Sequence, residues 1–403
     1  MTKCRICGSL LKIFFSLGEM PLVNSFLKKG DIKNEKKYDL SVGFCRNCYL
    51  VQLMKIVSPE ELFRDYVYFS SVTKSILDHS KKTAEEFIKR FDLSSKSFVL
   101  EIGSNDGVNL QFYKNVGIPI LGVDPAVNVA KVANSRGINT IADFFNLHLA
   151  QKLTKTKNIK ADLVYGANVL AHVPEIVDFV KGVKVILKSA GTAVFEFPYI
   201  KGLFENKFDT IYHEHVFYYS LIALKNLFNK ADLEIYDIEF IPMQGGSLRI
   251  FVSHFKKFKI SNRVKSLLKN EILEDYDKII TYKNMHTNVK KLKSKISSYL
   301  INLKKQGKRI VAYGAPAKGI ILLNFLEITK YLDFIVDKAP AKQGLYTPGV
   351  HMLVYPPQKI FDEKPDYVLI LSWNIAEEVM LDLYKYKKQG GKFIIPIPRV
   401  KVI

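Results

Sequence analysis

The 403-residue chain lacks any run of about 18 uncharged apolar residues, the length that a helix needs to cross a bilayer. Its first residues, MTKCRICGSL, also lack the apolar stretch of a secretory signal peptide. Hydrophobic residues still make up 48% of the chain, which is ordinary for a folded protein and argues against disorder. We therefore expect a soluble, cytoplasmic protein without a membrane partner.

Acidic residues are scarce relative to basic ones, with 39 Asp and Glu against 60 Lys and Arg and a formal net charge of +21. Nucleic acid, an anionic membrane surface or a phosphorylated small molecule would each suit this excess, and charge alone does not choose among them. Much of the excess lies in HFKKFKISNRVKSLLKN and NVKKLKSKISSYLINLKKQGKR, where Ile and Leu recur at helical spacing. We interpret these stretches as helices whose lysines face solvent.

Cysteine is missing after residue 48, and the four cysteines form two CxxC pairs, CRIC and CRNC. Four thiolates fill the tetrahedral shell of one structural zinc ion, and such a site has no open position for catalysis. A redox pair or unmetallated thiols are the alternatives that the spacing leaves open. We predict a zinc ion that stabilises the fold, with the ligands Cys4, Cys7, Cys45 and Cys48.

Apolar segments alternate with helical stretches between residues 95 and 200, in SFVLEIGSNDG, PILGVDPA, ADLVYGANVL and GTAVFEFPY. This alternation is typical of a mostly parallel sheet covered by helices on both faces. A second block of the same kind contains RIVAYGAPAKGIILLNFL, YLDFIVDKAP, DYVLILSW and GKFIIPIP. The predicted fold class is α/β, with a zinc-binding module (1–58), a central Rossmann-like domain with a helical lead-in (59–255), a helical connector (256–306) and a C-terminal Rossmann-like domain (307–403).

The turn in VLEIGSNDG carries Glu101, Gly103 and Gly107 at the end of an apolar strand. The glycines allow a tight turn and a close approach of a ligand to the start of a helix. The second glycine of the dinucleotide pattern GxGxxG is absent, because Asn105 takes its place. Asn and Asp side chains suit an amino-acid portion and a ribose better than a pyrophosphate. The next strand ends at Asp124, where a carboxylate can accept hydrogen bonds from two ribose hydroxyls.

This order of strand, glycine turn and acidic strand end resembles the S-adenosylmethionine fold of class I methyltransferases. The resemblance implies that DFF lies beside the adenine and that GANVLAHV approaches the sulfonium. An NAD-binding dinucleotide fold is the alternative. The expected cofactor residues are Glu101, Gly103, Asn105, Asp106, Gly107, Asp124, Pro125, Asp143, Phe144, Phe145 and Asn168.

The stretch IYHEHVFYYS crowds two histidines, a glutamate and three tyrosines into ten positions. Glu214 stands between His213 and His215, and a buried carboxylate at this point would need polar partners. A rigid aromatic cluster at a domain interface is the structural alternative. We interpret the stretch as a place where a substrate is held or deprotonated.

With QGGSLRIFV, AYGAPAKGIILLN, DKAPAKQGLYTPG and LSWN, these motifs resemble the sugar C-methyltransferases of deoxysugar pathways over essentially the whole chain. The resemblance implies methylation of carbon 3 of a nucleotide-linked 4-keto sugar. It also implies that the C-terminal domain completes the substrate cleft between the domains.

Carbon methylation beside a ketone needs a base, because the ketone acidifies the adjacent C–H and the resulting enolate attacks the methyl group. We assign the base to His215, whose unperturbed pKa lies near working pH. The family resemblance implies that Glu214 orients an imidazole and that Tyr212 hydrogen-bonds the ketone oxygen. It also implies a tyrosine from DYVYFSS, which is Tyr66 or, equally by chemistry, Tyr68. His172 either reaches the substrate or is structural.

The glycine spacing in the C-terminal YGAPAKG resembles that of a phosphate loop. It is not a true phosphate loop, because Ile320 and Ile321 follow where that motif has Lys and then Ser or Thr. A helix N-terminus with a nearby lysine can still hold a diphosphate. Judged alone, each of the basic residues is a plain surface cation. The expected substrate-binding residues are Tyr68, Arg249, Tyr313, Lys318 and Lys342.

Two other functions compete with carbon methylation. One is an O- or N-methyltransferase on a sugar nucleotide, and the other is an RNA-binding or RNA-modifying methyltransferase. Against the RNA alternative, the basic stretches lack an interleaved aromatic stacking face. We expect a sugar-nucleotide substrate, no nucleic-acid partner and a monomer or weak dimer. The nucleotide, the sugar, the product stereochemistry and the pathway are left open.

Overall fold

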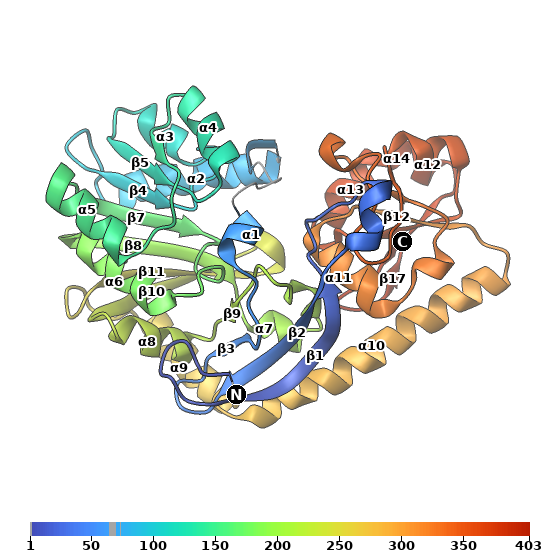
Figure 1. The fold of residues 1–403 in the computed structure, drawn as a ribbon, viewed down its shortest axis with the longest axis horizontal. Helices are drawn as coiled ribbons and strands as arrows, with labels where there is room; N and C mark the ends of the chain where they lie inside the picture. Colours follow the sequence, from blue (N-terminus) through green and yellow to red (C-terminus); the bar gives the residue numbers. More distant parts are fainter. Residues whose placement is uncertain (1, 64–69, 73) are drawn as a thin grey trace.

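The computed structural model describes residues 2–63, 70–72 and 74–403, which form three sheets (Figure 1). The N-terminal sheet is antiparallel, in the order β1-β2-β3-β9. Its last strand is donated by the middle of the chain, because Val51 pairs with Tyr218. The stretch IYHEHVFYYS therefore lies against the cysteine-bearing module. The strands are β1 (Leu11–Pro21), β2 (Lys37–Cys45), β3 (Val51–Leu53) and β9 (Phe217–Tyr218).

The central sheet has seven strands in the order β10-β11-β8-β7-β4-β5-β6, and the five from β8 to β6 run parallel. Its parallel strands are β4 (Val99–Ile102), β5 (Ile120–Val123), β6 (Thr140–Ile141), β7 (Ala161–Ala167) and β8 (Leu187–Pro198), and β10 (Leu233–Ile241) and β11 (Ser247–His254) are antiparallel. The accompanying helices are α2 (Lys74–Arg90), α3 (Leu110–Lys114), α4 (Val127–Ser135), α5 (Leu147–Lys157), α6 (Ile176–Ile186), α7 (Lys201–Phe204) and α8 (Leu221–Asn229). The parallel strands predicted from βαβ alternation are thus present.

The C-terminal sheet, β14-β13-β12-β15-β16-β17, repeats the parallel strand order of the central one. In both sheets the first strand lies between the second and the fourth, so each has a switch point where ligands of such folds bind. The strands are β12 (Ile310–Tyr313), β13 (Ile335–Val336), β14 (Val354–Tyr355), β15 (Tyr367–Ile370), β16 (Lys392–Ile395) and β17 (Lys401–Val402). The helices are α11 (Ala317–Leu326), α12 (Gln358–Glu363), α13 (Ala376–Asp382) and α14 (Tyr384–Lys388).

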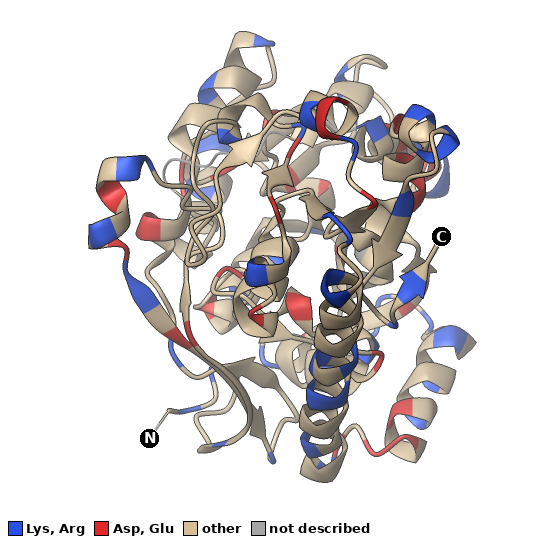
Figure 2. Ribbon diagram, turned by 90° about the vertical axis from the view of Figure 1, so that its right-hand side faces the viewer, with Lys and Arg blue, Asp and Glu red and all other residues tan. Residues whose placement is uncertain are grey.

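Two long elements connect the α/β domains, which stand side by side in Figure 1. Helix α9 (Asn262–Leu273) is followed by α10 (Ile279–Lys305), which runs beneath both domains. One face of α10 is apolar and buried, and basic residues recur along the helix (Figure 2), as the helical spacing of its Ile, Leu and Lys predicts. Within the described part of the chain, no helix has both the length and the apolarity to cross a membrane.

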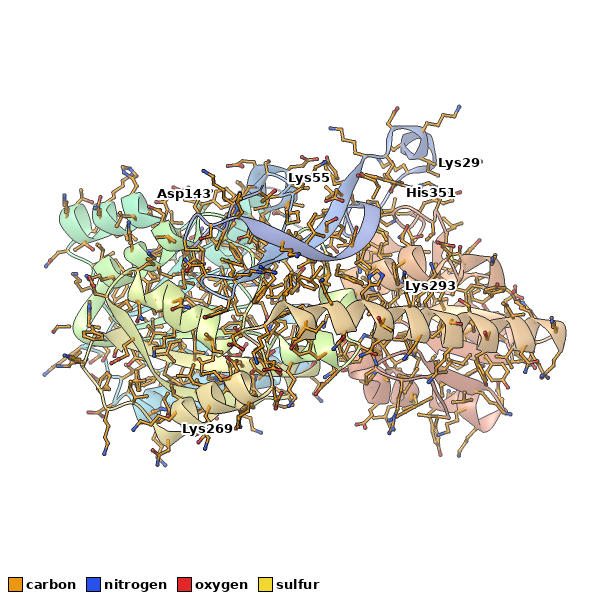
Figure 3. All side chains as sticks on the ribbon, turned by 90° about the horizontal axis from the view of Figure 1, so that it is seen from below. Lys29, Lys55, Asp143, Lys269, Lys293 and His351 are labelled. Atoms are coloured by element: carbon orange, nitrogen blue, oxygen red, sulfur yellow. The ribbon has the colours of Figure 1, made fainter. Side chains whose placement is uncertain are left out.

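The tip of the β1–β2 hairpin reaches the C-terminal domain. It contains the short helix η1 (Lys29–Asn34), and Lys29 of this tip and His351 of the C-terminal domain are labelled in Figure 3. Glu35 accepts hydrogen bonds from the backbone of Gly349 (2.7 Å) and from the His351 ring (2.8 Å). The N-terminal module thus contacts both α/β domains, because its other end pairs with β9.

Candidate active site

The cysteine pairs converge on one point at the base of the β1–β2 hairpin. All four sulfur atoms lie within 4.8 Å of one another, with Cys4 and Cys48 at 3.3 Å and Cys7 and Cys45 at 3.5 Å. A tetrahedral zinc ion with Zn–S bonds of about 2.3 Å places its sulfurs roughly 3.8 Å apart. The arrangement therefore fits one structural zinc ion. Such an ion would link the two ends of the hairpin.

The cofactor turn follows the fully buried strand β4. Gly103 and Gly107 have φ of +67° and +81°, and a Cβ on Gly107 would lie 2.9 Å from Ile138. A side chain at this position would meet both a strained backbone and a clash, so the glycine is required. Asn105 also has a positive φ of +48°, which asparagine tolerates better than most residues.

Asp124 follows β5 and faces this turn. Its carboxylate accepts hydrogen bonds from the backbone N–H groups of Asn105 (2.8 Å) and Ala126 (2.9 Å), one on each oxygen. Each oxygen keeps a second lone pair, which suits a ribose diol. Burial raises the pKa of Asp124, and the two backbone bonds oppose that rise.

Several buried polar atoms around the turn have no hydrogen-bond partner among the described residues. They are Glu101 Oε2, Ser104 Oγ, Asp106 Oδ1 and both amide atoms of Asn109. Buried polar groups without partners are uncommon, and a polar ligand or ordered water would satisfy them. The arrangement therefore fits the predicted S-adenosylmethionine. Burial also raises the pKa of Glu101 well above its usual value.

The remaining expected cofactor residues divide into two groups. Pro125, Asn168 and the exposed Asp143 lie at strand ends or loops beyond the sheet (Asp143 is labelled in Figure 3), and Phe144 is half-buried. Phe145 instead faces the core, where its ring lies 5.4 Å from that of Phe179. We therefore withdraw Phe145 from the adenine-flanking set, because the strand-to-helix connection turns it inward.

Every residue of IYHEHVFYYS is buried. The Nδ1 atom of His215 lies 2.8 Å from the carbonyl oxygen of Thr210, and its Nε2 atom lies 2.8 Å from the Tyr212 hydroxyl. A carbonyl oxygen can only accept, so Nδ1 carries the ring proton and Nε2 keeps its lone pair. Burial, with His172 adding to it, lowers the pKa of His215 well below its usual value. The imidazole is therefore neutral at neutral pH.

His172 lies beside this imidazole, with ring centroids 4.8 Å apart in an edge-on arrangement. Burial lowers the pKa of His172 to about 4. The loop after β7 and the segment before β9 thus present two neutral histidines to one place. Tyr66 and Tyr68 lie outside the described residues. The segment directly after them reaches the cofactor turn, since the Ser70 N–H donates to Asn105 Oδ1 at 2.8 Å.

Glu214 has a partner in the N-terminal module. Its carboxylate accepts a hydrogen bond from the Asn24 side chain at 2.5 Å, and His213 contacts the backbone oxygen of Tyr38 at 3.2 Å. The Thr210 carbonyl orients His215. Sequence reasoning missed both Thr210 and Asn24. Neither belongs to a motif, because one acts through its backbone and the other comes from the N-terminal module.

The C-terminal domain repeats the arrangement around Asp124. Asp337, at the end of β13, accepts hydrogen bonds from the backbone N–H groups of Ala315 (2.6 Å) and Ala339 (2.8 Å). The Lys342 ammonium donates to the Ala315 carbonyl at 2.9 Å and lies 3.8 Å from Asp337. An acidic strand end held in this way is typical of a nucleoside site. Asp337 is not among the substrate-binding residues predicted from the sequence.

The other expected substrate residues lie in different surroundings. Lys318 is buried, with its ammonium 5.5 Å from the ring of Trp373, and burial lowers its pKa. Tyr313 is buried in the C-terminal sheet. Arg249 is also buried, and it binds Glu196 at 2.8 Å within the central domain. We therefore correct its assignment: Arg249 belongs to an internal ion-pair network and does not face a phosphate.

Comparison with known proteins defines the class. Family models match as a zinc binding domain (residues 4–63), a methyltransferase domain (76–238) and a C-methyltransferase C-terminal domain (242–398). The protein is thus an S-adenosylmethionine-dependent methyltransferase with a zinc-binding module. A curated relative, the C-methyltransferase NovU of Streptomyces niveus, is 33% identical over 407 residues, which span 100% of this chain and 96% of NovU. The chain belongs to this family of C-methyltransferases.

Solved methyltransferases resemble part of the chain. An S-adenosylmethionine-dependent methyltransferase from Clostridium acetobutylicum is 10% identical, with a TM-score of 0.35 over 44% of this chain and 92% of that one. Magnesium protoporphyrin IX methyltransferase (ChlM) from Synechocystis PCC 6803 is 11% identical, with a TM-score of 0.35 over 44% and 83% of the two chains. Family membership rests on the sequence matches.

Proposed function

We propose that this C-methyltransferase methylates carbon 3 of a nucleotide-linked 4-keto sugar by way of an enolate. The observation that carries the proposal is the neutral imidazole of His215, whose Nδ1 is held by the Thr210 carbonyl and whose Nε2 lies at the Tyr212 hydroxyl. A buried neutral imidazole is available as a base at neutral pH. The family's C-methyl chemistry requires such a base, because an unactivated C–H bond does not attack a sulfonium.

The reaction balances with the residues in these positions. Nε2 of His215 takes the proton from carbon 3, and the electron pair of that C–H bond forms the enolate with charge on the ketone oxygen. The cofactor supplies an electrophilic methyl group. With the cofactor bound, carbon 3 of the enolate would bond to that methyl group, the methyl–sulfur electron pair would stay on sulfur, and the ketone would re-form. The imidazolium then loses its proton to water.

Tyr212 has two possible parts in the proton transfer, and both end with the proton on Nε2 of His215. Its hydroxyl can turn to the developing enolate oxygen, which releases the Nε2 lone pair for carbon 3. Alternatively, the tyrosine oxygen takes the proton while its own proton passes to Nε2 over the 2.8 Å hydrogen bond. Tyr212→Phe separates the routes, because only the second requires the hydroxyl for proton removal.

The nucleotide portion is assigned to the C-terminal domain of the proposed division, residues 307–403. The carboxylate of Asp337 suits the sugar of the nucleoside, as Asp124 suits that of the cofactor. The turn at Gly314 and the N-terminus of α11 suit a diphosphate, with Lys342 close by. The 4-keto sugar would then lie toward His215, because Lys318 of α11 is near enough for its charge to lower the pKa of His215.

The test combines a substrate panel with hydrogen exchange. Sugar nucleotides bearing dTDP, GDP, CDP or UDP are incubated with enzyme and S-adenosylmethionine, and methyl gain is measured by mass spectrometry. The accepted substrate is then incubated in deuterium oxide with S-adenosylhomocysteine. We expect exchange at carbon 3, because only the enolate route releases that hydrogen. Methyl transfer to oxygen or nitrogen, without exchange, would refute the proposal.

The base assignment is tested with His215→Ala. This variant should lose both exchange and methyl transfer while it still binds S-adenosylmethionine in calorimetry. His148→Ala is the matched control, because His148 is exposed on α5. Exchange at the wild-type rate in His215→Ala would discard the base.

A further inference from the structure

The chain has a single tryptophan, Trp373, and its side chain joins the C-terminal domain to the segment that carries His215. The indole N–H of Trp373 donates a hydrogen bond of 2.6 Å to Oδ2 of Asp209. Asp209 is fully buried and directly precedes Thr210, whose carbonyl holds Nδ1 of His215. Two hydrogen bonds, joined by the Asp209–Thr210 peptide, therefore link η7 (Trp373–Ile375), which follows β15, to the imidazole of the central domain.

Motifs that are distant in the sequence enclose this indole. A Cβ on Gly245 would lie 2.7 Å from Cη2 of Trp373, so the glycine of QGG leaves the space that the ring occupies. The Lys207 ammonium donates to the Gly245 carbonyl at 2.7 Å, and the Lys318 ammonium lies 5.5 Å from the ring. The proposed chemistry does not use the motifs QGG and LSWN. Their role in the structure is to place the indole of Trp373 beside Gly245.

We propose that Trp373 is a positioning residue, which fixes the place and direction of the His215 imidazole through Asp209 and Thr210. The inference rests on the proposed function, in which His215 is the base. The proton transfer then depends on docking of the C-terminal domain, so the domain that receives the nucleotide also aligns the base. Trp373 itself touches neither the reacting carbon nor the methyl group.

The physical basis is the cost of burying a carboxylate. Asp209 is completely buried, and its Oδ1 atom has no hydrogen-bond partner among the described residues. Burial raises the pKa of Asp209 to about 6. The nearby Lys318 charge and the hydrogen bond from Trp373 act in the opposite direction and lower it. Without the indole N–H, the carboxylate would either take up a proton or move, and Thr210 would move with it. A displacement of about 1 Å at a catalytic group can cost on the order of 100-fold in rate.

The first test compares three variants on the substrate that the wild type accepts. Trp373→Phe keeps an aromatic ring but removes the donor, and we expect kcat to fall roughly 10- to 100-fold. The KM for the sugar nucleotide and the affinity for S-adenosylmethionine should stay near their wild-type values. Asp209→Asn keeps an acceptor for the indole, so we expect it to retain most of the activity. Tyr199→Phe is the control, because it removes a 2.7 Å donor to the buried Glu271.

A second measurement needs no substrate. Emission from the only tryptophan is followed against pH at the red edge of absorption, where tyrosine does not contribute. In the wild type the emission should change as Asp209 titrates near pH 6, and the change should vanish in Asp209→Asn. The charged groups beside Asp209 are the Lys207 and Lys318 ammonium groups, and burial lowers the pKa of Lys318, so the loss of the emission change in Asp209→Asn assigns the change to Asp209.

The outcomes separate this inference from the proposed function. If the wild type methylates no member of the panel, the proposed function fails, and the emission titration still tests the bond between Trp373 and Asp209. If Trp373→Phe methylates the accepted substrate at the wild-type rate, the positioning role fails while the function stands. A loss of kcat in Tyr199→Phe equal to that in Trp373→Phe would also overturn the inference, as would a flat emission profile.

Discussion

Replacing Arg249 with methionine tests whether this residue binds phosphate or stabilises the central domain. Arg249 is 3% exposed, and its guanidinium is held by Glu196 at 2.8 Å, Glu86 at 3.0 Å and Glu239 at 3.1 Å. Glu196 is also 3% exposed. In Arg249→Met the buried Glu196 carboxylate loses the guanidinium and is left with its contact to His79 at 2.8 Å. Breaking a buried pair by removing one partner costs about 3 to 5 kcal/mol.

For a domain of this size, that loss lowers the melting temperature by roughly 10 °C. Circular dichroism on heating measures the shift at several pH values. In the wild type, burial raises the pKa of Glu196, but His79 and Arg249 outweigh it and hold the pKa below its usual value. Without Arg249 the pKa of Glu196 rises above its unfolded value. The destabilisation should therefore be largest at high pH and shrink as Glu196 takes up a proton on acidification.

Two further variants make the test quantitative. Arg249→Met combined with Glu196→Gln should recover most of the lost stability, because both buried charges are then removed. Arg263→Met is the surface control: its side chain is 56% exposed beside Asp237, and its loss should cost less than about 1 kcal/mol. An unchanged melting temperature in Arg249→Met, together with a raised KM for the sugar nucleotide, would refute the structural role and restore a phosphate contact.

Three other predictions concern the site. The pKa of His215 is lowered by burial, so kcat/KM should stay level as pH falls through about 6.5, and a decline centred at or above that pH in a pH–rate profile would contradict the assignment. Asp124→Ala removes a charged hydrogen-bonding group, so calorimetry should show S-adenosylmethionine affinity falling about 10- to 100-fold, and unchanged affinity would exclude the ribose contact. Removal of zinc should abolish methyl transfer but not cofactor binding, because Asn24 of the zinc module contacts Glu214. Asn24→Ala should reproduce part of this loss in kcat. Full activity of a metal-free preparation, checked by metal analysis, would refute that link.

Local patterns predicted much of the framework. The two CxxC pairs required no tertiary information, because four thiolates with no other cysteine in the chain leave one obvious metal site. The parallel strands were visible in βαβ alternation, and the turn with Gly107 was expected from its glycines at the end of an apolar strand. The positive φ of Gly107 and its close neighbour Ile138 were added by the structure. The place of Asp124 directly after a strand was also predicted from strand order, and its role at the ribose stays a prediction.

Other features were invisible or misread. Arg249 looked like a surface cation, yet its neighbours Glu86 and Glu196 come from separate elements that only packing brings together. Phe145 was grouped with Asp143 by adjacency, although the chain turns it into the core. The partner of Glu214 could not be predicted either, because Asn24 lies far away in the sequence and carries no motif.

The sequence by itself determined the chemistry that the chain can offer: four thiolates, an acidic strand end after a glycine turn, and an imidazole in a stretch too polar for simple packing. Those properties depend on residue type and on the spacing of residues that lie close together in the sequence. Only the tertiary structure decided which atoms hold that imidazole. Its tautomer depends on the Thr210 carbonyl, and the segment around it contacts Asn24 and Trp373, one from each flanking domain. Hydrogen bonds act over about 3 Å, so such partners exist only after distant parts of the chain have packed together.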